Sequence, residues 1–319
     1  MAFDAGDHGQ TVGIIGIGLL GSAIADRLSA AGYLLSGFDP APASQKAFSE
    51  NAGCAVLHVC DIAAATDTIV LCLPNSDVVE QVLTDIIPHL KSNTTLIDTT
   101  TGEPDRTKEL SERLVAANVN LLDASVLGSS DVARAGNAVL MVGGDTASFQ
   151  RVRPVLQAIS PHVSHVGPVG SGQQMKLVAN LVLGLNRAAL AEGLSFAKSQ
   201  GLDLNRVLDI LKSGAAYSTV MDAKGRKMID DDFEPQAKLS QHLKDVRLIL
   251  KLATASDSAL PLSLLHEQLL ESAEAAGNGE LDNSAIIRAW RRHGAESAGR
   301  LPPVPECDST VPRNIRPRI

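Results

Sequence analysis

The stretch that decides the fold is VGIIGIGLLG, residues 12–21. An apolar run typical of a buried strand leads directly into three glycines with the spacing G-x-G-x-x-G. Gly16 permits a tight turn, Gly18 lets a pyrophosphate approach the backbone, and Gly21 lets the following helix pack closely on the strand. An ordinary strand-to-helix turn is the alternative. The spacing favours a dinucleotide-binding loop made of Gly16, Ile17, Gly18, Leu19, Leu20 and Gly21.

The residues around this loop predict a β-α-β unit. Leu20, Ile24 and Leu28 recur at helical spacing, and Gly32 is a suitable residue to end that helix. Short apolar runs then alternate with helical patterns, which is typical of a parallel sheet with crossover helices. The predicted strands are residues 12–15, 34–38, 68–73, 95–98 and 120–124.

An acidic residue ends the second predicted strand. Asp39 stands 18 residues after Gly21, where a carboxylate accepts hydrogen bonds from the adenosine ribose hydroxyls and repels a 2′-phosphate. NAD is therefore expected in preference to NADP. The alternative is that Asp39 and Pro40 only initiate a turn.

Two further strand ends are candidates for cofactor contact. Leu73 and Pro74 follow the strand at residues 68–73, at the carboxyl edge where open α/β sheets bind ligands. Thr101 follows residues 95–98 and is expected on the nicotinamide side of the cofactor. A helix N-cap before Pro104 is an equally good explanation for one of these threonines.

The pattern changes near residue 165, where a glycine-rich breaker cluster precedes a half that reads almost wholly as helix. We expect an α/β Rossmann-type N-terminal domain at residues 1–168 and an all-helical C-terminal domain for substrate binding and oligomerisation at residues 169–300. Residues 301–319, rich in proline and arginine, are expected to form a flexible tail. The predicted helices are residues 173–200, apolar on most faces and so expected to be buried on several sides, 239–253 and 284–292.

The first of these helices carries a lysine and an asparagine four positions apart. Lys176 and Asn180 therefore project from one face near the start of a mostly apolar helix. An ammonium group in apolar surroundings is costly to desolvate unless it has a partner or a function. On the helix pattern alone, a surface lysine beside a capping-type asparagine is an equal alternative.

Four blocks in this order resemble the β-hydroxyacid dehydrogenase family, which includes 3-hydroxyisobutyrate dehydrogenase and tartronate semialdehyde reductase. They are the glycine loop, DASVLGS at residues 123–129, GSGQQMKLVAN at residues 170–180, and Phe233 followed by LKDV at residues 243–246. The resemblance covers nearly the whole chain. Together the blocks are far more specific than any one of them.

The resemblance implies roles for individual residues. Lys176 would be the general acid/base and Asn180 would orient the substrate, as hydride transfer to or from a hydroxyl carbon requires. Lys244 would lie near the cofactor. Ser125, Gly128 and Ser129 would contact the substrate. The family block commonly reads Asp-Ala-Pro-Val-Ser-Gly-Gly, so Leu127 replaces a hydrogen-bonding serine and predicts an altered, more apolar pocket.

We therefore predict an NAD-dependent oxidoreductase that interconverts a small 3-hydroxy acid and its semialdehyde or 3-oxo acid. Two other functions stay open: an imine reductase-like enzyme, which typically lacks the lysine, and a catalytically silent NAD-binding interaction module. A decarboxylating 6-phosphogluconate dehydrogenase is disfavoured, because its helical half is much larger.

Composition limits the partners. The net charge of −8 argues against an extended nucleic-acid surface, which would need a basic stripe. The four cysteines form no metal-binding or CxxC pattern, so no metal site is expected and the thiols are expected to be reduced. No export signal or membrane-spanning helix is expected, which makes the cytoplasm the default location. The resemblance implies a homodimer or homotetramer.

Overall fold

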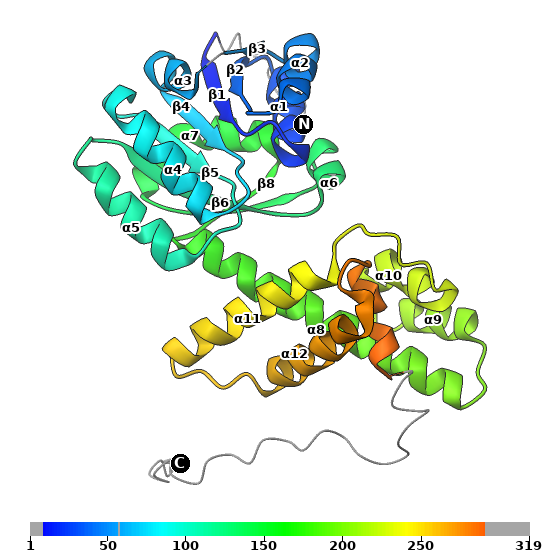
Figure 1. Ribbon diagram of the computed structural model, residues 1–319. Helices are drawn as coiled ribbons and strands as arrows, with labels where there is room; N and C mark the ends of the chain where they lie inside the picture. The colour runs from blue at the N-terminus through cyan, green and yellow to red at the C-terminus, as the bar shows by residue number, and fades with distance from the viewer. Residues whose placement is uncertain (1–8, 57, 291–319) are drawn as a thin grey trace. The chain divides into compact units, whose positions relative to one another are not determined.

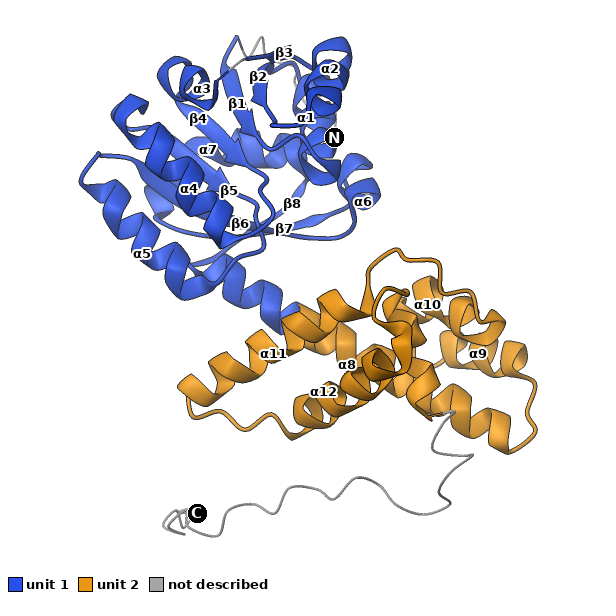
Figure 2. Ribbon diagram, in the orientation of Figure 1, with its two compact units in different colours: residues 1–179 blue, residues 180–319 orange. Residues whose placement is uncertain are grey.

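The computed structural model describes residues 9–56 and 58–290. It divides the chain into two compact units, residues 1–179 and residues 180–319 (Figure 2). The expected flexible tail at residues 301–319, and Cys307 within it, lie outside the described residues. Each unit is described by itself below.

The first unit is built on one eight-stranded sheet (Figure 1). Its spatial order is β3-β2-β1-β4-β5-β6-β7-β8. The strands are β1 (Thr11–Ile15), β2 (Leu34–Phe38), β3 (Cys54–Ala55), β4 (Thr68–Leu71), β5 (Thr95–Asp98), β6 (Asn120–Leu127), β7 (Val139–Gly143) and β8 (His162–Gly167). The five predicted strands are all present. Strands β3, β7 and β8 were not predicted from the sequence.

The five predicted strands pair in parallel as expected, but the whole sheet is mixed. Strand β7 pairs antiparallel with β6, whereas every other neighbouring pair is parallel. A parallel return needs a crossover of a dozen or more residues, usually with a full helix. The connection from β6 to β7 contains only the short helix α6 (Ser130–Arg134), so the chain turns back beside the strand it has left.

Helices cover both faces of this sheet. The core on one face includes residues of α1 (Leu19–Ala30), α2 (Pro42–Asn51) and α7 (Thr146–Ile159). The core on the other face includes residues of α3 (Val59–Ala65), α4 (Ser76–Ile86) and α5 (Pro104–Val115). A one-turn helix, η1 (Ile87–His89), follows α4. Strand β1 serves both cores, because Ile14 and Ile15 point to opposite faces. The N-terminal half is the expected doubly wound α/β domain.

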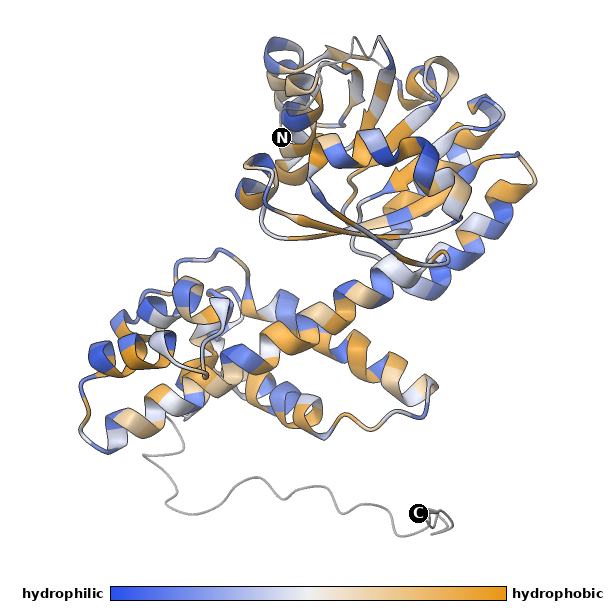
Figure 3. Ribbon diagram, turned by 180° about the vertical axis from the view of Figure 1, so that it is seen from behind, coloured by the Kyte–Doolittle hydropathy of each residue, from blue (hydrophilic) through white to orange (hydrophobic). Residues whose placement is uncertain are grey.

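The second unit is helical and has a core of its own. Figure 3 shows hydrophobic residues following faces of its helices. Helix α8 (Ser171–Ser199) begins in the first unit and ends in this one. The others are α9 (Leu204–Ser213), α10 (Thr219–Asp230), α11 (Leu239–Ala255), α12 (Pro261–Ala273), η2 (Glu274–Asn278) and η3 (Asn283–Ile286). The helix predicted at residues 284–292 begins as the 3-10 turn η3, and residues 291 and 292 lie outside the described part of the chain.

Helix α8 is less buried than its sequence predicts, which corrects that expectation. In the second unit Val182 is 50% exposed and Phe196 is 66% exposed. Its buried side, with Leu190 and Leu194, belongs to the helical core, but the single chain leaves its other apolar side uncovered. Among the described residues α8 is also long and apolar enough to cross a membrane, a test that core helices of soluble proteins pass equally.

Candidate cofactor site and catalytic helix

The three glycines of the turn, Gly16, Gly18 and Gly21, have different structural roles. Gly16 has a φ of 92°, and a Cβ there would lie 2.3 Å from the Cys72 carbonyl oxygen. A Cβ on Gly21 would lie 2.0 Å from the carbonyl oxygen of Gly16, so only glycine lets α1 pack this close to the turn. At Gly18 nothing lies within 4 Å of such an atom. The backbone is therefore open to a ligand at Gly18, at the N-terminus of α1, which favours anions.

A hollow of about 650 Å³ opens beside this turn. It lies at the carboxyl ends of β1, β2, β4 and β5, and the sheet order reverses between β1 and β4. This is the topological switch point at which open α/β sheets bind ligands. Most of the predicted cofactor residues line it: Gly16, Gly18, Leu19, Leu20, Gly21, Asp39, Leu73, Pro74 and Thr101.

Ile17 does not line that hollow, but it lines a neighbouring one between α1 and α2. Its side chain is 4% exposed and belongs to the core under α1. Its backbone N–H donates to Asp39 Oδ2 over 2.7 Å. The side chain and the N–H of Ile17 are therefore both already engaged within the protein. The predicted contact of Ile17 with the cofactor would have to be made by another of its atoms.

Asp39 is both a turn residue and a candidate ribose ligand. Its Oδ1 accepts from the Ala41 N–H at 2.9 Å, while Oδ2 holds the Ile17 N–H. Both interpretations from the sequence are thus compatible, because a carboxylate oxygen has two lone pairs and can accept a second hydrogen bond. The two backbone bonds fix the carboxylate at the rim of the hollow.

The loop after β5 forms the opposite rim. Thr100 Oγ1 accepts the Leu73 N–H at 3.0 Å, which joins the ends of β4 and β5. Thr101 is exposed and lines the hollow. The alternative role of a threonine as N-cap for the next helix is wrong, because the N-cap of α5 is Glu103.

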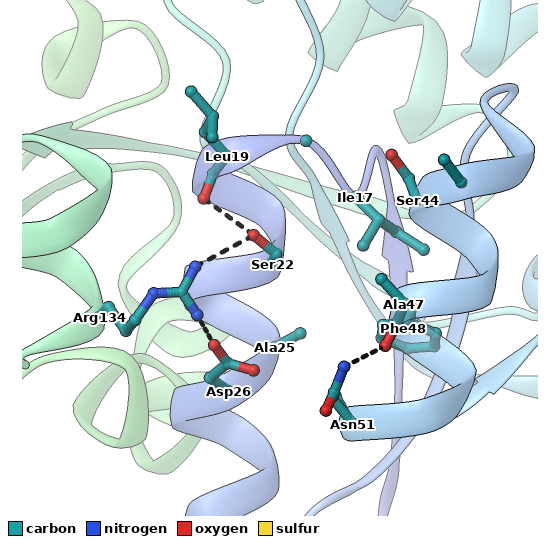
Figure 4. Close-up of a pocket in the computed structure, with 13 residues that line it drawn as sticks. Ile17, Leu19, Ser22, Ala25, Asp26, Ser44, Ala47, Phe48, Asn51 and Arg134 are labelled. Carbon is teal, nitrogen blue, oxygen red and sulfur yellow. Dashed lines mark hydrogen bonds and ion pairs between the residues drawn. The ribbon is translucent and has the colours of Figure 1, made fainter.

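A second hollow of about 900 Å³ lies between α1 and α2 and shares Gly18 and Leu19 with the first (Figure 4). Its one basic lining residue is Arg134, which the sequence reading did not single out. The Arg134 guanidinium forms an ion pair with Asp26 and donates to Ser22 Oγ at 3.3 Å. Among the residues that the structure describes, no lysine or arginine lines the first hollow.

Two buried carboxylates lie under the site. Asp98 is 3% exposed and Asp123 is fully buried. Burial raises the pKa of Asp98 to about 6, although hydrogen bonds from Thr100 oppose the shift. Burial also raises the pKa of Asp123, against hydrogen bonds from the backbone of Gln173 and Gly170. Desolvation is the dominant cause in both, because it disfavours the charged form.

The predicted substrate block forms the end of β6 and the start of α6. Ser125 is 2% exposed, so its hydroxyl is held inside the domain. Gly128 has a φ of 143°, a conformation that favours glycine. Ser129 is the N-cap of α6, and its Oγ accepts the Val132 N–H at 3.3 Å. The Gly128 turn, rather than Ser125, is the more accessible part of this block.

Lys176 is half-buried in the first turns of α8. Its Nζ donates to the Val126 carbonyl oxygen over 2.6 Å, so the ammonium is held against the predicted substrate block. The alternative of a freely solvated surface lysine does not fit this contact.

Asn180 is the first residue of the second unit, one helical turn further along α8. Its Nδ2 donates to Asp245 Oδ2 at 3.1 Å. Lys244 precedes that aspartate on α11 and is exposed, whereas Phe233 is buried with the Arg288 guanidinium 4.5 Å over its ring. Within the second unit, Asn180 thus joins α8 to α11 next to Lys244.

Three residues with clear site geometry were not given roles from the sequence: Asp98, Arg134 and Gln173. Asp98 gave a signal, since an acidic residue ending an apolar strand is a candidate for buried hydrogen bonding. The sequence around Arg134 and Gln173 gave no such signal, because the residues that they contact are distant in the chain.

Comparison with known proteins identifies the family to which the chain is similar. Residues 11–167 match the family model described as the NAD binding domain of 6-phosphogluconate dehydrogenase. Residues 170–290 match the model described as NAD-binding of NADP-dependent 3-hydroxyisobutyrate dehydrogenase. The chain therefore carries an NAD(P)-binding domain of this type.

The chain is 32% identical to 2-hydroxy-3-oxopropionate reductase of Escherichia coli (strain K12), over 87% of this chain and 96% of that protein. It is 31% identical to 2-(hydroxymethyl)glutarate dehydrogenase of Eubacterium barkeri, over 88% of this chain and 95% of the relative. The crystal structure of 3-hydroxyisobutyrate dehydrogenase from Salmonella typhimurium superposes with a TM-score of 0.78 at 29% identity, covering 88% and 99% of the two chains. The chain belongs to the β-hydroxyacid dehydrogenase family of NAD(P)-dependent oxidoreductases.

Proposed function

We propose that this protein interconverts a small 3-hydroxy acid and its semialdehyde or 3-oxo acid, with NAD as the hydride carrier and Lys176 as the general acid/base. The observation that supports this most directly is the 2.6 Å hydrogen bond from Lys176 Nζ to the Val126 carbonyl oxygen. It holds an ammonium group at the substrate block, in the same unit as the nucleotide-binding turn. The relatives named above act, by name, on hydroxy acids or their oxo counterparts.

The groups that would hold the cofactor suit a dinucleotide. Gly18 presents open backbone at the start of α1 for the pyrophosphate, and Asp39 presents carboxylate oxygens for the ribose. Once bound, the nicotinamide accepts or returns the hydride. The neutral amine of Lys176 would take the hydroxyl proton during oxidation, and its ammonium form would return that proton during reduction. Asn180 would orient the substrate through its amide, and the backbone at Gly128 would meet the carboxylate.

The catalytic role of Lys176 can be tested by measuring the rate of NAD reduction with a panel of 3-hydroxy acids and four-carbon sugar acids. We expect Lys176→Ala to lower kcat by 10² to 10⁴-fold, which is the usual contribution of general acid–base catalysis. Lys198→Ala is the matched control, because Lys198 is an exposed lysine on the same helix. A Lys176→Ala variant that keeps the parent's turnover would refute the role of Lys176.

We propose NAD rather than NADP as the preferred cofactor. The Asp39 carboxylate would repel a 2′-phosphate. In the described part of the chain, Arg134 is the one basic residue that lines either hollow, and it is already paired with Asp26. We expect kcat/KM to be at least about tenfold higher with NAD, and Asp39→Asn to narrow that ratio. Equal rates of the unmodified enzyme with both cofactors would contradict this assignment.

We also propose a homodimer or homotetramer located in the cytoplasm. Val182, Ala189 and Phe196 are exposed at seven-residue spacing on α8 and form an apolar stripe that a second copy could cover. The cysteines of the described chain, Cys54, Cys60 and Cys72, are free thiols, as in a reducing compartment. Light scattering of Val182→Asp beside the parent protein tests the stripe, and a variant that assembles normally would refute it.

A further inference from the structure

We propose that Gln173 is a positioning residue that ties the cofactor loop around Thr101 to the first turn of α8, and so sets where Lys176 stands relative to the cofactor. The inference rests on the proposed function for its catalytic consequence. The physical link itself does not depend on any substrate.

The Gln173 side chain holds the loop from both sides of Thr101. Its Nε2 donates to the Thr100 carbonyl oxygen at 2.6 Å, and its Oε1 accepts the Gly102 N–H at 3.0 Å. One amide group thus satisfies the two backbone groups that flank Thr101. The side chain is 1% exposed, so water does not compete for these bonds. Thr101, held between them, lines the hollow together with Thr99 and Thr100.

Other contacts make the loop a defined conformation. Ser76 Oγ accepts the Glu103 N–H at 3.1 Å, and a Cβ on Gly102 would lie 2.7 Å from the same hydroxyl. Asp98 Oδ1 accepts the Thr100 N–H at 2.9 Å. The loop is therefore fixed to β5 at one end and to α4 at the other, and Gln173 is its link to α8.

The start of α8 is in turn fixed to β6. The two Asp123 oxygens accept the N–H groups of Gly170 and Gln173, at 2.7 and 2.8 Å. A Cβ on Gly172 would lie 2.3 Å from the Asp123 carbonyl oxygen, so the first turn is pressed directly against the strand. Capping by a carboxylate also suits the positive end of the helix.

Lys176 stands three residues after Gln173, on the next turn of α8. Its ammonium reaches Val126 on β6, the strand that also carries Asp123. A shift of the first turn moves the ammonium with it, and misplacement of a reacting group by about 1 Å can cost 10²-fold in rate. Gln173 is thus the connection between the position of the acid/base and that of the cofactor loop.

Two substitutions separate this role from a purely structural one. Gln173→Met keeps the length of the side chain but removes both hydrogen bonds. Gln173→Glu keeps an acceptor for the Gly102 N–H and can donate to the Thr100 carbonyl only when protonated. Gln174→Ala is the matched control, because Gln174 is the exposed neighbour on the same turn.

The first measurement is hydrogen–deuterium exchange of the substrate-free full chain. We expect the Gly102 amide to exchange at least about tenfold faster in Gln173→Met than in Gln174→Ala, because it loses its acceptor. Unchanged exchange would overturn the link, whatever the enzyme proves to act on. This readout remains valid if the unmodified protein oxidises no hydroxy acid, a result that would refute the proposed function alone.

The second measurement is turnover with the best hydroxy acid and with its C-deuterated form. We expect Gln173→Met to lower kcat by 10- to 100-fold, with substrate KM changed less than about threefold and a larger deuterium isotope effect. The contrary result is a fall in kcat with an unchanged isotope effect and a lower Tm. It would show that Gln173 has only a structural role and would overturn the proposal.

The third measurement is the pH profile of Gln173→Glu, taken as the ratio of its kcat to that of the parent at each pH. A protonated carboxyl can replace the amide, so we expect this ratio to rise at least fivefold as the pH falls from 8 to 5.5. The charged groups on the elements packed around this position are Asp98 on β5, Asp123 on β6, Lys108 on α5 and Lys176 on α8 itself. A ratio independent of pH would contradict the bidentate hydrogen bonding.

Discussion

The two units of this protein both bury ionisable groups, but burial shifts the pKa values of those groups in different directions. The first unit buries the carboxyls of Asp98 and Asp123, and burial raises the pKa of both. The second unit buries cationic and imidazole groups, and burial lowers the pKa of each: Arg187, Lys224, His242 and His266. The two halves of one chain should therefore respond to acid in opposite directions.

The source of compensation also differs. In the first unit backbone N–H groups satisfy the carboxylates, as at the start of α8. In the second unit the Asp282 carboxylate bonds to the buried Lys224 ammonium in addition to backbone N–H groups of Gln236, Ala237 and Ser284. It is 0% exposed, and its oxygens accept from Lys224 Nζ at 2.8 and 3.0 Å and from Ser284 Oγ at 2.7 Å. Burial alone would raise the pKa of Asp282, but these hydrogen bonds outweigh it and lower the pKa to about 2.

The comparison teaches that Asp123, bonded to the backbone N–H groups of Gly170 and Gln173, is fixed by the fold. Asp282 also has backbone donors, but it carries the charge of a buried lysine as well, and that pair can be undone by a single substitution. Asp123 keeps its backbone donors whatever the neighbouring side chains are. Asp282 and Lys224 depend on each other, since a buried charge that loses its partner is strongly destabilising.

The largest expected effect is therefore in the second unit. Asp282→Ala should lower the free energy of unfolding by about 3 to 5 kcal/mol, because it leaves the Lys224 ammonium buried without its carboxylate. Urea unfolding monitored by circular dichroism measures it. Asp222→Ala is the control, as Asp222 pairs with Lys212 at the surface of the same unit. A loss below about 1 kcal/mol for Asp282→Ala would show that the second unit does not rely on this carboxylate.

The next effect is acid sensitivity of the second unit through His266. Burial and the Arg187 charge lower the pKa of His266 to about 4. A depressed histidine contributes stability that is present above its unfolded pKa, near 6.5, and that is lost as the pH falls toward 4. The full loss corresponds to about 3.5 kcal/mol, from roughly 1.4 kcal/mol per unit of pKa. His266→Gln should flatten this part of the stability profile, and a profile as steep as the parent's would count against the assignment.

The smallest effect has the opposite sign and belongs to the first unit. The folded pKa of Asp98 is raised to about 6, so ionising it costs stability as the pH rises from near 4 through 6. Asp98→Asn keeps an acceptor for the Thr100 N–H and cannot ionise. Relative to the parent, the variant should gain about 3 kcal/mol of stability between pH 4 and pH 7.5. The measurement is urea unfolding of both proteins across this pH range. If the free energy of unfolding changed equally with pH in both, the proposed difference in acid response between the two units would be wrong.

The sequence by itself determined the elements whose signals are local. The glycine spacing predicted the turn at residues 16–21, because only glycine tolerates the close backbone contacts at Gly16 and Gly21. Period-two and period-3.6 patterns located five strands and the long helix α8 to within a few residues. The position of Asp39 after β2 could be predicted as well, since the fingerprint carries its own spacing.

Only the tertiary structure decided which distant groups meet. Gln173 bonds to Thr100 and Gly102, more than 70 residues away, and Lys224 pairs with Asp282, 58 residues away. It also decided that β7 runs against β6 and that one side of α8 stays exposed in the single chain. Local patterns record the period of burial along one element. They do not specify which strand edges and helix faces pack together. That packing determines which groups the buried charges contact.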